Sequence, residues 1–156
     1  TIQIDFQLAE RFGMTYVDAE GQTKYPYVIH RTSIGCYERT LALLLEKYAG
    51  ALPTWLMPEQ VRVLPISDRL IDDAKKVEEQ LSRAGIRVSC DTRSEKVGYK
   101  IREAQLEKIP YMLVIGDKEV EDGTVSVRSR KEGDLGSMPV ESFLSKILQE
   151  ISTKAK

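Results

Sequence analysis

The second part of the chain alternates short apolar segments with amphipathic ones, and this alternation restricts the fold more than any other feature. Val61–Ile66 and Ile86–Cys90 have the composition of buried strands, and a helix closed by Gly85 is predicted between them. A second helix is expected over Lys96–Lys108, followed by a strand over Tyr111–Ile115. Strands that alternate with helices favour an α/β fold, a mixed sheet flanked by helices with right-handed crossovers.

Further segments complete this part of the chain. Ser67 or Asp68 is expected to cap the first helix, since short polar side chains accept hydrogen bonds from helix N–H groups. The remaining predictions run in order: a loop over Gly116–Gly123, a strand over Thr124–Arg130, a Gly-Asp-Leu-Gly turn, and a final helix that begins at Pro139.

The first part of the chain is organised differently. It opens with a strand-like alternation over Thr1–Phe6 and continues into a hairpin around Asp18–Thr23. A helix follows from Tyr37 to Tyr48 and has apolar residues on both faces. We therefore expect other parts of the structure to pack against both sides of this helix. The stretch Leu-Pro-Thr-Trp-Leu-Met-Pro then predicts a linker, because proline removes backbone donors.

Composition excludes several classes of function. The 156 residues suit one domain, or one domain plus a fragment of another, and the formal net charge is −1 from 23 basic and 24 acidic side chains. With no global basic field we expect neither DNA nor non-specific nucleic-acid binding, so any RNA contact must be local.

The remaining sequence signals concern location. Cys36 and Cys90 lie far apart, which suits a reducing cytoplasm, and no run approaches the roughly 20 apolar residues of a membrane span. We therefore expect a soluble cytoplasmic protein without a membrane partner. Because strand-like residues begin at Thr1 without a methionine, we also expect a chain cut from something longer.

The segment Tyr27–Arg39 carries two candidate site residues. It places the only histidine, His30, at the end of a strand-like run, and a Gly-x-x-Glu-Arg sequence puts Arg39 at the start of the apolar helix. A guanidinium on such a helix needs an anion or a carboxylate. A lone histidine is more often an ordinary core imidazole, and residue type alone leaves both roles open for His30.

Two clusters of basic residues mark the second part of the chain. With Glu119, they are expected to border one sheet face, where a carboxylate accepts from a base amino group, an arginine forks onto a base edge and lysines bind phosphates. A solvated charged surface is the commoner explanation for such clusters. The first cluster comprises Arg93, Lys96, Lys100 and Arg102, and the second comprises Arg128, Arg130 and Lys131.

Together the motifs resemble the C-terminal part of threonyl-tRNA synthetases, which are class II aminoacyl-tRNA synthetases. The resemblance runs from Thr1 to about Ile151 and is strongest at Ile-His-Arg ahead of Gly-x-x-Glu-Arg, at Gly-Tyr-Lys-Ile-Arg-Glu and at Ile-Pro-Tyr-Met-Leu-Val-Ile-Gly-Asp-Lys-Glu. It implies that residues 1–57 are the C-terminal fragment of an antiparallel-sheet catalytic domain with motif 3. Residues 58–156 are then an α/β anticodon-binding domain, a domain also found in the prolyl, histidyl and glycyl enzymes.

The resemblance implies a threonine–tRNA ligase that activates threonine with ATP and magnesium, releases pyrophosphate and aminoacylates threonine tRNA. In the first domain, Arg39 matches the catalytic motif 3 arginine that braces the ATP γ-phosphate, and Thr1 and Gln3 match positions near the adenylate. His30 matches one of three zinc ligands. The other zinc ligands and motifs 1 and 2 are absent from this chain, so we expect it to be inactive alone.

In the second domain the resemblance implies an anticodon site. Ser94, Glu119 and Arg128 match base-reading positions, and Lys96 lies beside them near the RNA backbone. The chain departs from the family at Ser94, where asparagine is common, and at Cys36, where serine is usual. The parent is expected to dimerise through the missing catalytic region. The alternative is a free-standing anticodon-domain-like RNA-binding or accessory protein without ligase activity, for which His30, Arg39 and Gln3 have no evident use.

Overall fold

The computed structural model describes residues 1–155. These divide into two compact units, 1–44 and 45–155. Each unit is described by itself below.

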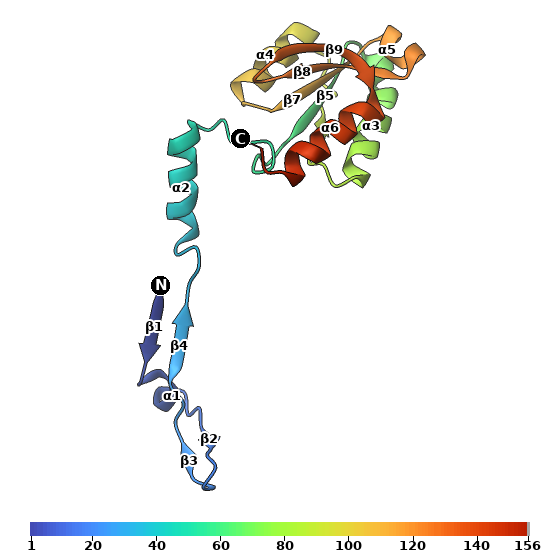
Figure 1. Ribbon diagram of the computed structural model, residues 1–156. Helices are drawn as coiled ribbons and strands as arrows, with labels where there is room; N and C mark the ends of the chain where they lie inside the picture. The colour runs from blue at the N-terminus through green and yellow to red at the C-terminus, as the bar shows by residue number, and fades with distance from the viewer. Residues whose placement is uncertain (156) are drawn as a thin grey trace. The chain divides into compact units, whose positions relative to one another are not determined.

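The N-terminal unit consists of two small antiparallel pairs of strands and the start of a helix. Its elements are β1 (Ile2–Asp5), α1 (Leu8–Arg11), β2 (Tyr16–Val17), β3 (Thr23–Lys24), β4 (Val28–Arg31) and the first part of α2 (Tyr37–Tyr48). β1 pairs with β4 and β2 pairs with β3 (Figure 1). The predicted first strand, hairpin and helix are therefore confirmed.

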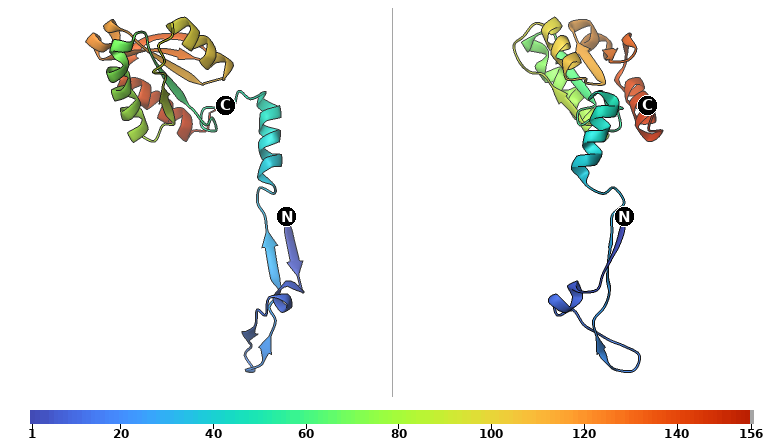
Figure 2. Two further views of the ribbon diagram at one scale, coloured as in Figure 1. Left: turned by 180° about the vertical axis from the view of Figure 1, so that it is seen from behind. Right: turned by 90° about the vertical axis from the view of Figure 1, so that its left-hand side faces the viewer.

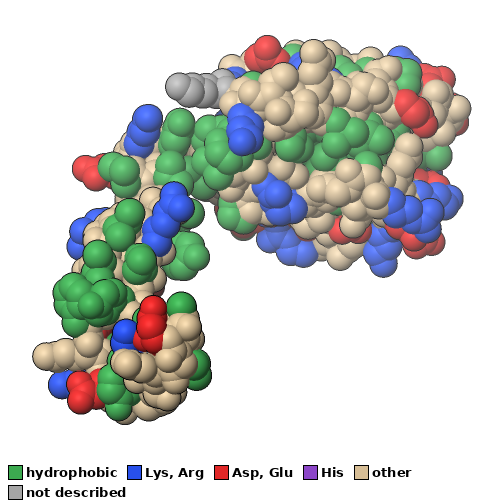
Figure 3. Space-filling model, turned by 60° about the horizontal axis from the view of Figure 1, so that its bottom comes forward, with side chains coloured by type: hydrophobic (Ala, Val, Ile, Leu, Met, Phe, Trp, Pro, Cys, Tyr) green, Lys and Arg blue, Asp and Glu red, His purple; other side chains and the backbone are tan. Residues whose placement is uncertain are grey.

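This unit has almost no buried core. Among residues 1–44 only Ala9 is buried, while Phe12 and Tyr27 are each 72% exposed. No residue of α2 is buried. The described residues therefore do not pack against both faces of this helix, as the sequence predicted they would. Figure 3 shows hydrophobic side chains spread openly over the N-terminal unit.

The C-terminal unit is a five-stranded mixed sheet in the order β6-β5-β7-β8-β9. β5, β6 and β7 run parallel, and β8 and β9 run antiparallel to their neighbours. The strands are β5 (Val61–Pro65), β6 (Val88–Cys90), β7 (Tyr111–Ile115), β8 (Thr124–Ser129) and β9 (Gly133–Pro139). The helices are η1 (Asp68–Leu70), α3 (Ile71–Arg83), α4 (Val97–Leu106), α5 (Asp117–Asp122) and α6 (Val140–Ser152).

The helices cover the two sheet faces unequally, as Figures 1 and 2 show. α3 and α6 pack on one face, where Phe143 and Leu81 join alternate strand residues such as Leu113 in the main core. On the other face Ala104 of α4 packs over Met112 and its neighbours. The α/β fold with a mixed sheet flanked by helices is confirmed. Within residues 1–155 the core on this second face includes no residue of β8 or β9, which leaves that face of the hairpin open.

Two local predictions are wrong. The stretch 116–123, expected as a loop because glycine stands at both ends, contains the short helix α5. The Gly-Asp-Leu-Gly turn is instead the start of strand β9, where Gly133 and Gly136 adopt φ of 79° and 76° and the ladder shifts register between Val127 and Arg128. A bulged strand uses glycine at positive φ, so the same residues that indicate a turn are accommodated inside a sheet.

The predicted linker contains no helix or strand, but it is firmly held. Arg130 donates to the carbonyl oxygens of Leu52 at 2.7 Å, Ala51 at 3.3 Å and Lys108 at 2.5 Å. Burial lowers the pKa of this guanidinium, whose hydrogen-bond acceptors are all backbone carbonyls. Arg130 therefore holds the linker in place. Although it belongs to the second basic cluster in sequence, its guanidinium is already occupied by these carbonyls.

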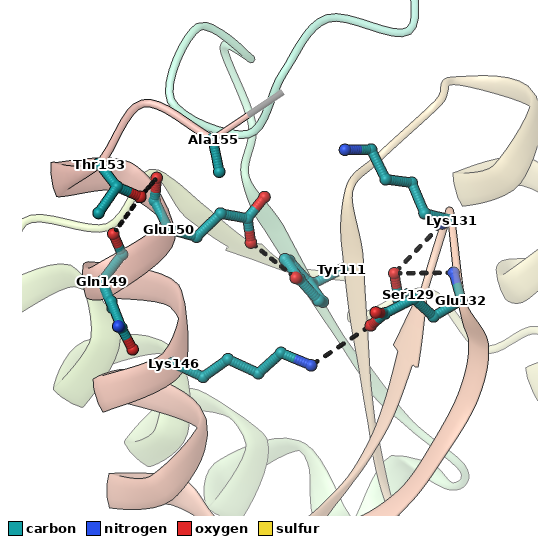
Figure 4. Close-up of a pocket in the computed structure, with 9 residues that line it drawn as sticks. All are labelled: Tyr111, Ser129, Lys131, Glu132, Lys146, Gln149, Glu150, Thr153 and Ala155. Carbon is teal, nitrogen blue, oxygen red and sulfur yellow. Dashed lines mark hydrogen bonds and ion pairs between the residues drawn. The ribbon is translucent and has the colours of Figure 1, made fainter.

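A second set of contacts ties the linker to α6. Glu150 accepts a hydrogen bond from the Thr54 hydroxyl at 2.6 Å and another from the Tyr111 hydroxyl at 2.7 Å. Burial, together with this bond, raises the pKa of Tyr111, so the phenol stays protonated and donates. Figure 4 shows Tyr111 and Glu150 in a cavity of about 320 Å³ between α6 and the strands. The cavity is therefore part of the structural attachment of α6.

The role of Arg130 can be tested by Arg130→Met, which keeps the aliphatic stem and removes the donors. We expect a loss of about 2–4 kcal/mol in the free energy of unfolding, because three carbonyls lose charge-assisted hydrogen bonds. Chymotrypsin should also cleave after Trp55 faster. The matched control is Lys131→Met at the neighbouring exposed residue. Equal urea midpoints for the two variants would show that Arg130 does not hold the linker.

Candidate functional site

The carboxyl ends of three parallel strands meet at one edge of the sheet, and a buried lysine fixes the loops there. Lys100 of α4 is 3% exposed, and its ammonium donates to the carbonyl of Asp91 at 3.0 Å and of Pro65 at 3.3 Å. These carbonyls belong to the segments that leave β6 and β5. Open α/β sheets place ligand sites outside the carboxyl ends of their strands, so this edge is the first place to search.

Arg93, on the loop after β6, also forms its ion pairs within the domain. It donates to both carboxylate oxygens of Asp91, at 2.9 and 2.6 Å, and to Glu103 at 2.5 Å. The hydrogen bonds from Arg93 lower the pKa of Asp91. Of the first basic cluster, the buried Lys100 and the exposed Arg93 thus have partners within the domain, whereas the exposed Lys96 and Arg102 make no side-chain hydrogen bond or ion pair within residues 1–155.

Ser94 lies on this loop and contacts a residue that the sequence analysis assigned differently. Its hydroxyl donates to Oδ2 of Asp68 at 2.9 Å. Ser67 stands at the predicted N-cap position, but its side chain makes no cap hydrogen bond, and the prediction is wrong for Asp68, which lies within η1. Polar residues before a helix usually indicate a cap, and no local signal distinguishes one that instead bonds to a loop 26 residues away.

Glu119 is oriented by the first turn of α5. Its Oε2 accepts the N–H of Gly116 at 3.0 Å, and its Oε1 accepts the Ser137 hydroxyl at 3.4 Å. A Cβ at Gly116 would stand 2.7 Å from Oε2. A methyl group at position 116 would therefore require this carboxylate to move.

Arg128 lies farther along the sheet. It is opposite Met112 on β7, and its guanidinium donates to Asp134 at 3.1 Å. On the open face of the hairpin Ser126 pairs with Ser137, between Arg128 and the position of Glu119. The structure therefore places Ser94 on a loop at the carboxyl edge, Glu119 in the first turn of α5 at the same edge, Lys96 at the start of α4, and Arg128 on the adjoining hairpin face.

In the N-terminal unit, Gln3 and His30 are direct partners in the β1–β4 ladder, and both are exposed. The N-terminal ammonium of Thr1 donates to the Thr32 carbonyl at 2.9 Å. Arg39 is exposed in the first turn of α2. These groups are accessible to a ligand.

The candidate metal ligand His30 has no ligating partners among residues 1–155. Residues 1–155 contain no group of three His, Cys, Asp or Glu side chains placed to hold a metal ion. His30 offers a suitable donor, but the described residues do not complete a zinc site. Across the same residues, no helix combines the length and apolar character that crossing a bilayer requires.

Two family models match the chain. The model described as an anticodon binding domain matches residues 60–150. The model described as the tRNA synthetase class II core domain (G, H, P, S and T) matches residues 1–48.

Curated relatives cover nearly the whole chain. A threonine–tRNA ligase from Clostridium perfringens (strain SM101 / Type A) is 62% identical over 154 residues, covering 99% of this chain and 24% of the relative. One from Clostridium botulinum (strain Eklund 17B / Type B) is 58% identical over 156 residues, covering 100% of this chain and 24% of the relative. The chain thus spans about a quarter of the length of these relatives.

One solved structure is similar to this chain. It is the crystal structure of the RNA binding domain of threonyl-tRNA synthetase from Cryptosporidium parvum Iowa II, with a TM-score of 0.73 and 39% identity. The similarity covers 95% of this chain and 38% of that one.

The orientation of Glu119 can be tested by Gly116→Ala. We expect a loss of about 1–3 kcal/mol in the free energy of unfolding, because the new methyl displaces the carboxylate and leaves the buried Gly116 N–H unpaired. Gly98→Ala in α4 is the control, since a Cβ there has nothing within 4 Å and should stabilise the helix by up to about 1 kcal/mol. Equal urea midpoints would mean that Glu119 is not held at Gly116.

Proposed function

This chain belongs to the anticodon binding domain family, and we propose that its residues 58–156 bind the anticodon loop of threonine tRNA. The observation that carries the proposal is the polar edge formed by the loops after β5, β6 and β7, which presents Ser94 and Glu119 beside the open face that holds Arg128. Bases in an unpaired loop can be read by carboxylates, hydroxyls and guanidinium groups on their edges. Lys96, exposed at the start of α4, is assigned to the RNA backbone.

We assign residues 1–57 to the catalytic domain of a threonine–tRNA ligase. Such an enzyme activates threonine with ATP and magnesium, releases pyrophosphate and esterifies the terminal ribose of its tRNA. Identity of 62% with a ligase of that name over 154 residues supports the assignment. Arg39 is proposed to brace the γ-phosphate, a task suited to a permanently charged planar fork. Thr1 and Gln3 are proposed to lie near the adenylate.

His30 is proposed to supply one protein ligand to a zinc ion. It does not complete that site within this chain, so its partners would come from the remaining length of the longer protein. The same longer protein is proposed to be a cytoplasmic homodimer. Neither zinc nor dimerisation is required for the anticodon contacts described above.

The proposed anticodon site predicts different effects for a residue that contacts a base and a residue that contacts a phosphate. Arg128→Ala should cost about 1–3 kcal/mol in binding a hairpin RNA with the threonine anticodon, and little with an altered anticodon, because a lost base contact weakens only the sequence that made it. Lys96→Ala should weaken both RNAs alike and flatten the salt dependence. Equal losses for both hairpins in Arg128→Ala, titrated at one salt concentration, would make Arg128 a phosphate anchor.

The catalytic assignment predicts that this chain alone is inactive. Phosphoryl chemistry requires several groups that converge in an enclosed site, whereas residues 1–44 bury only Ala9. Threonine-dependent exchange between ATP and pyrophosphate should therefore not exceed background. The full-length Clostridium perfringens relative serves as the positive control. Exchange by the purified chain would contradict the prediction.

A further inference from the structure

The segment that follows α2 has no helix or strand, yet side chains of the C-terminal unit hold most of its backbone carbonyls. We call residues 49–57 the anchored segment. The carbonyls that accept a side-chain hydrogen bond are those of Ala49, Ala51, Leu52, Thr54, Trp55 and Met57. The donors are the side chains of Lys108, Arg130, Gln60 and Arg87. A backbone satisfied in this way cannot change its conformation without breaking these bonds.

The middle of the anchored segment is buried as well as bonded. Leu52 and Thr54 are 6% and 4% exposed. Arg130 donates to the Leu52 carbonyl at 2.7 Å. The Thr54 carbonyl accepts from Gln60 at 3.0 Å, and the Thr54 hydroxyl donates to Glu150 at 2.6 Å. The segment therefore moves with the C-terminal sheet and is not a flexible tether.

The donors share one edge of the sheet. Three of them stand just before the parallel strands β5, β6 and β7, namely Gln60, Arg87 and Lys108. Arg130 directly follows β8, which runs antiparallel to β7 and so ends at the same edge. The anchored segment is thus fixed to the amino edge of the sheet, whereas Ser94 lies at the carboxyl edge. The close-packed core between the two edges transmits a displacement instead of absorbing it.

A held segment and a flexible one have different kinetic consequences for a ligase that binds its RNA on this sheet. A flexible tether only raises the local concentration of the bound RNA, which lowers the KM. A rigid connection also fixes the direction in which the RNA is presented, and orientation contributes to the rate of the chemical step. The anchored segment begins directly after α2, the helix that carries Arg39. It is therefore the connection through which such an orientation would act.

We propose that Arg130 and Glu150 are positioning residues for aminoacylation, because they hold the anchored segment and thereby orient the bound tRNA for threonine transfer. Neither residue touches the reacting atoms in this role. Glu150 is included because its carboxylate accepts the Thr54 hydroxyl, although it also accepts the Tyr111 hydroxyl from β7. The proposal rests on the ligase function proposed above and adds two residues to it.

The test measures three quantities in the longer protein that contains this chain. They are threonine-dependent exchange between ATP and pyrophosphate, the KM for threonine tRNA, and the single-turnover rate of threonine transfer at saturating tRNA. Thr54→Val removes the hydroxyl that joins the anchored segment to Glu150 and keeps the size of the side chain. We expect transfer to slow about 3- to 10-fold, with exchange and KM within about 2-fold of the unaltered protein.

Tyr111→Phe is the matched control. It removes the other hydrogen bond to the same carboxylate, so both variants leave one oxygen of Glu150 without its donor. Only Thr54→Val detaches the anchored segment from α6. Tyr111→Phe should therefore leave the rate of transfer unchanged.

Arg130→Met removes more of the contacts and should slow transfer about 10- to 100-fold. Because this variant also loses stability, its fold is checked by its affinity for a hairpin RNA with the threonine anticodon, which should be unchanged. If that affinity falls, the comparison of Thr54→Val with Tyr111→Phe decides alone.

The outcomes separate this inference from the function on which it rests. If Thr54→Val and Tyr111→Phe change the rate of transfer equally, or not at all, the anchored segment does not orient the tRNA and only this inference is overturned. A higher KM at an unchanged rate of transfer would also overturn it, since the segment would then act only as a tether. If the unaltered longer protein does not charge threonine tRNA, the ligase function is wrong and this inference is wrong with it.

Discussion

The buried ammonium of Lys100 is the interaction on which the arrangement of the candidate site depends. An ion 3% exposed is costly to bury unless its donors are satisfied, and here the carbonyls of Pro65 and Asp91 accept from it. Those carbonyls lie where two parallel strands end. One side chain of α4 thereby fixes the start of both loops, so Asp68 and Ser94 meet at 2.9 Å although they are far apart in sequence. The polar edge is thus positioned by the core of the domain rather than by its own contacts.

The architecture of the C-terminal unit could be predicted because its signals are local and agree. Apolar periodicity identified β5, α3, β6, α4, β7 and α6 before any contact was known. The failures at α5 and β9 have a common cause, since glycine permits both a turn and a regular element and only tertiary pairing decides between them. For the site, residue types indicated Glu119 and Arg128, but Asp68 was assigned to a cap. Its partner is Ser94, and a hydrogen bond between distant loops leaves no periodic trace in sequence.

Basic residues near the candidate site show why composition alone identifies function poorly. Arg93, Lys100 and Arg130 belong to clusters that indicate RNA binding, yet the structure uses all three to fix loops and the linker. Guanidinium and ammonium groups have several donors, so they can satisfy backbone carbonyls that no other element reaches. The exposed members, such as Lys96, are the ones left for a polyanion. Burial and existing partners therefore have to be known before a basic cluster is assigned to a ligand.

The two units differ in what determines their stability. The sheet and its helices bury a continuous core around Phe143 and Leu113, which can offset the loss of conformational entropy. In the N-terminal unit the β1–β4 pair is four residues long and exposes Ile2, Ile4 and Ile29, and isolated two-stranded pairs are at best marginally stable in water. A substitution at Gln3 or His30 should hence change the global free energy of unfolding very little. The stability of the C-terminal unit can therefore be interpreted from its own core.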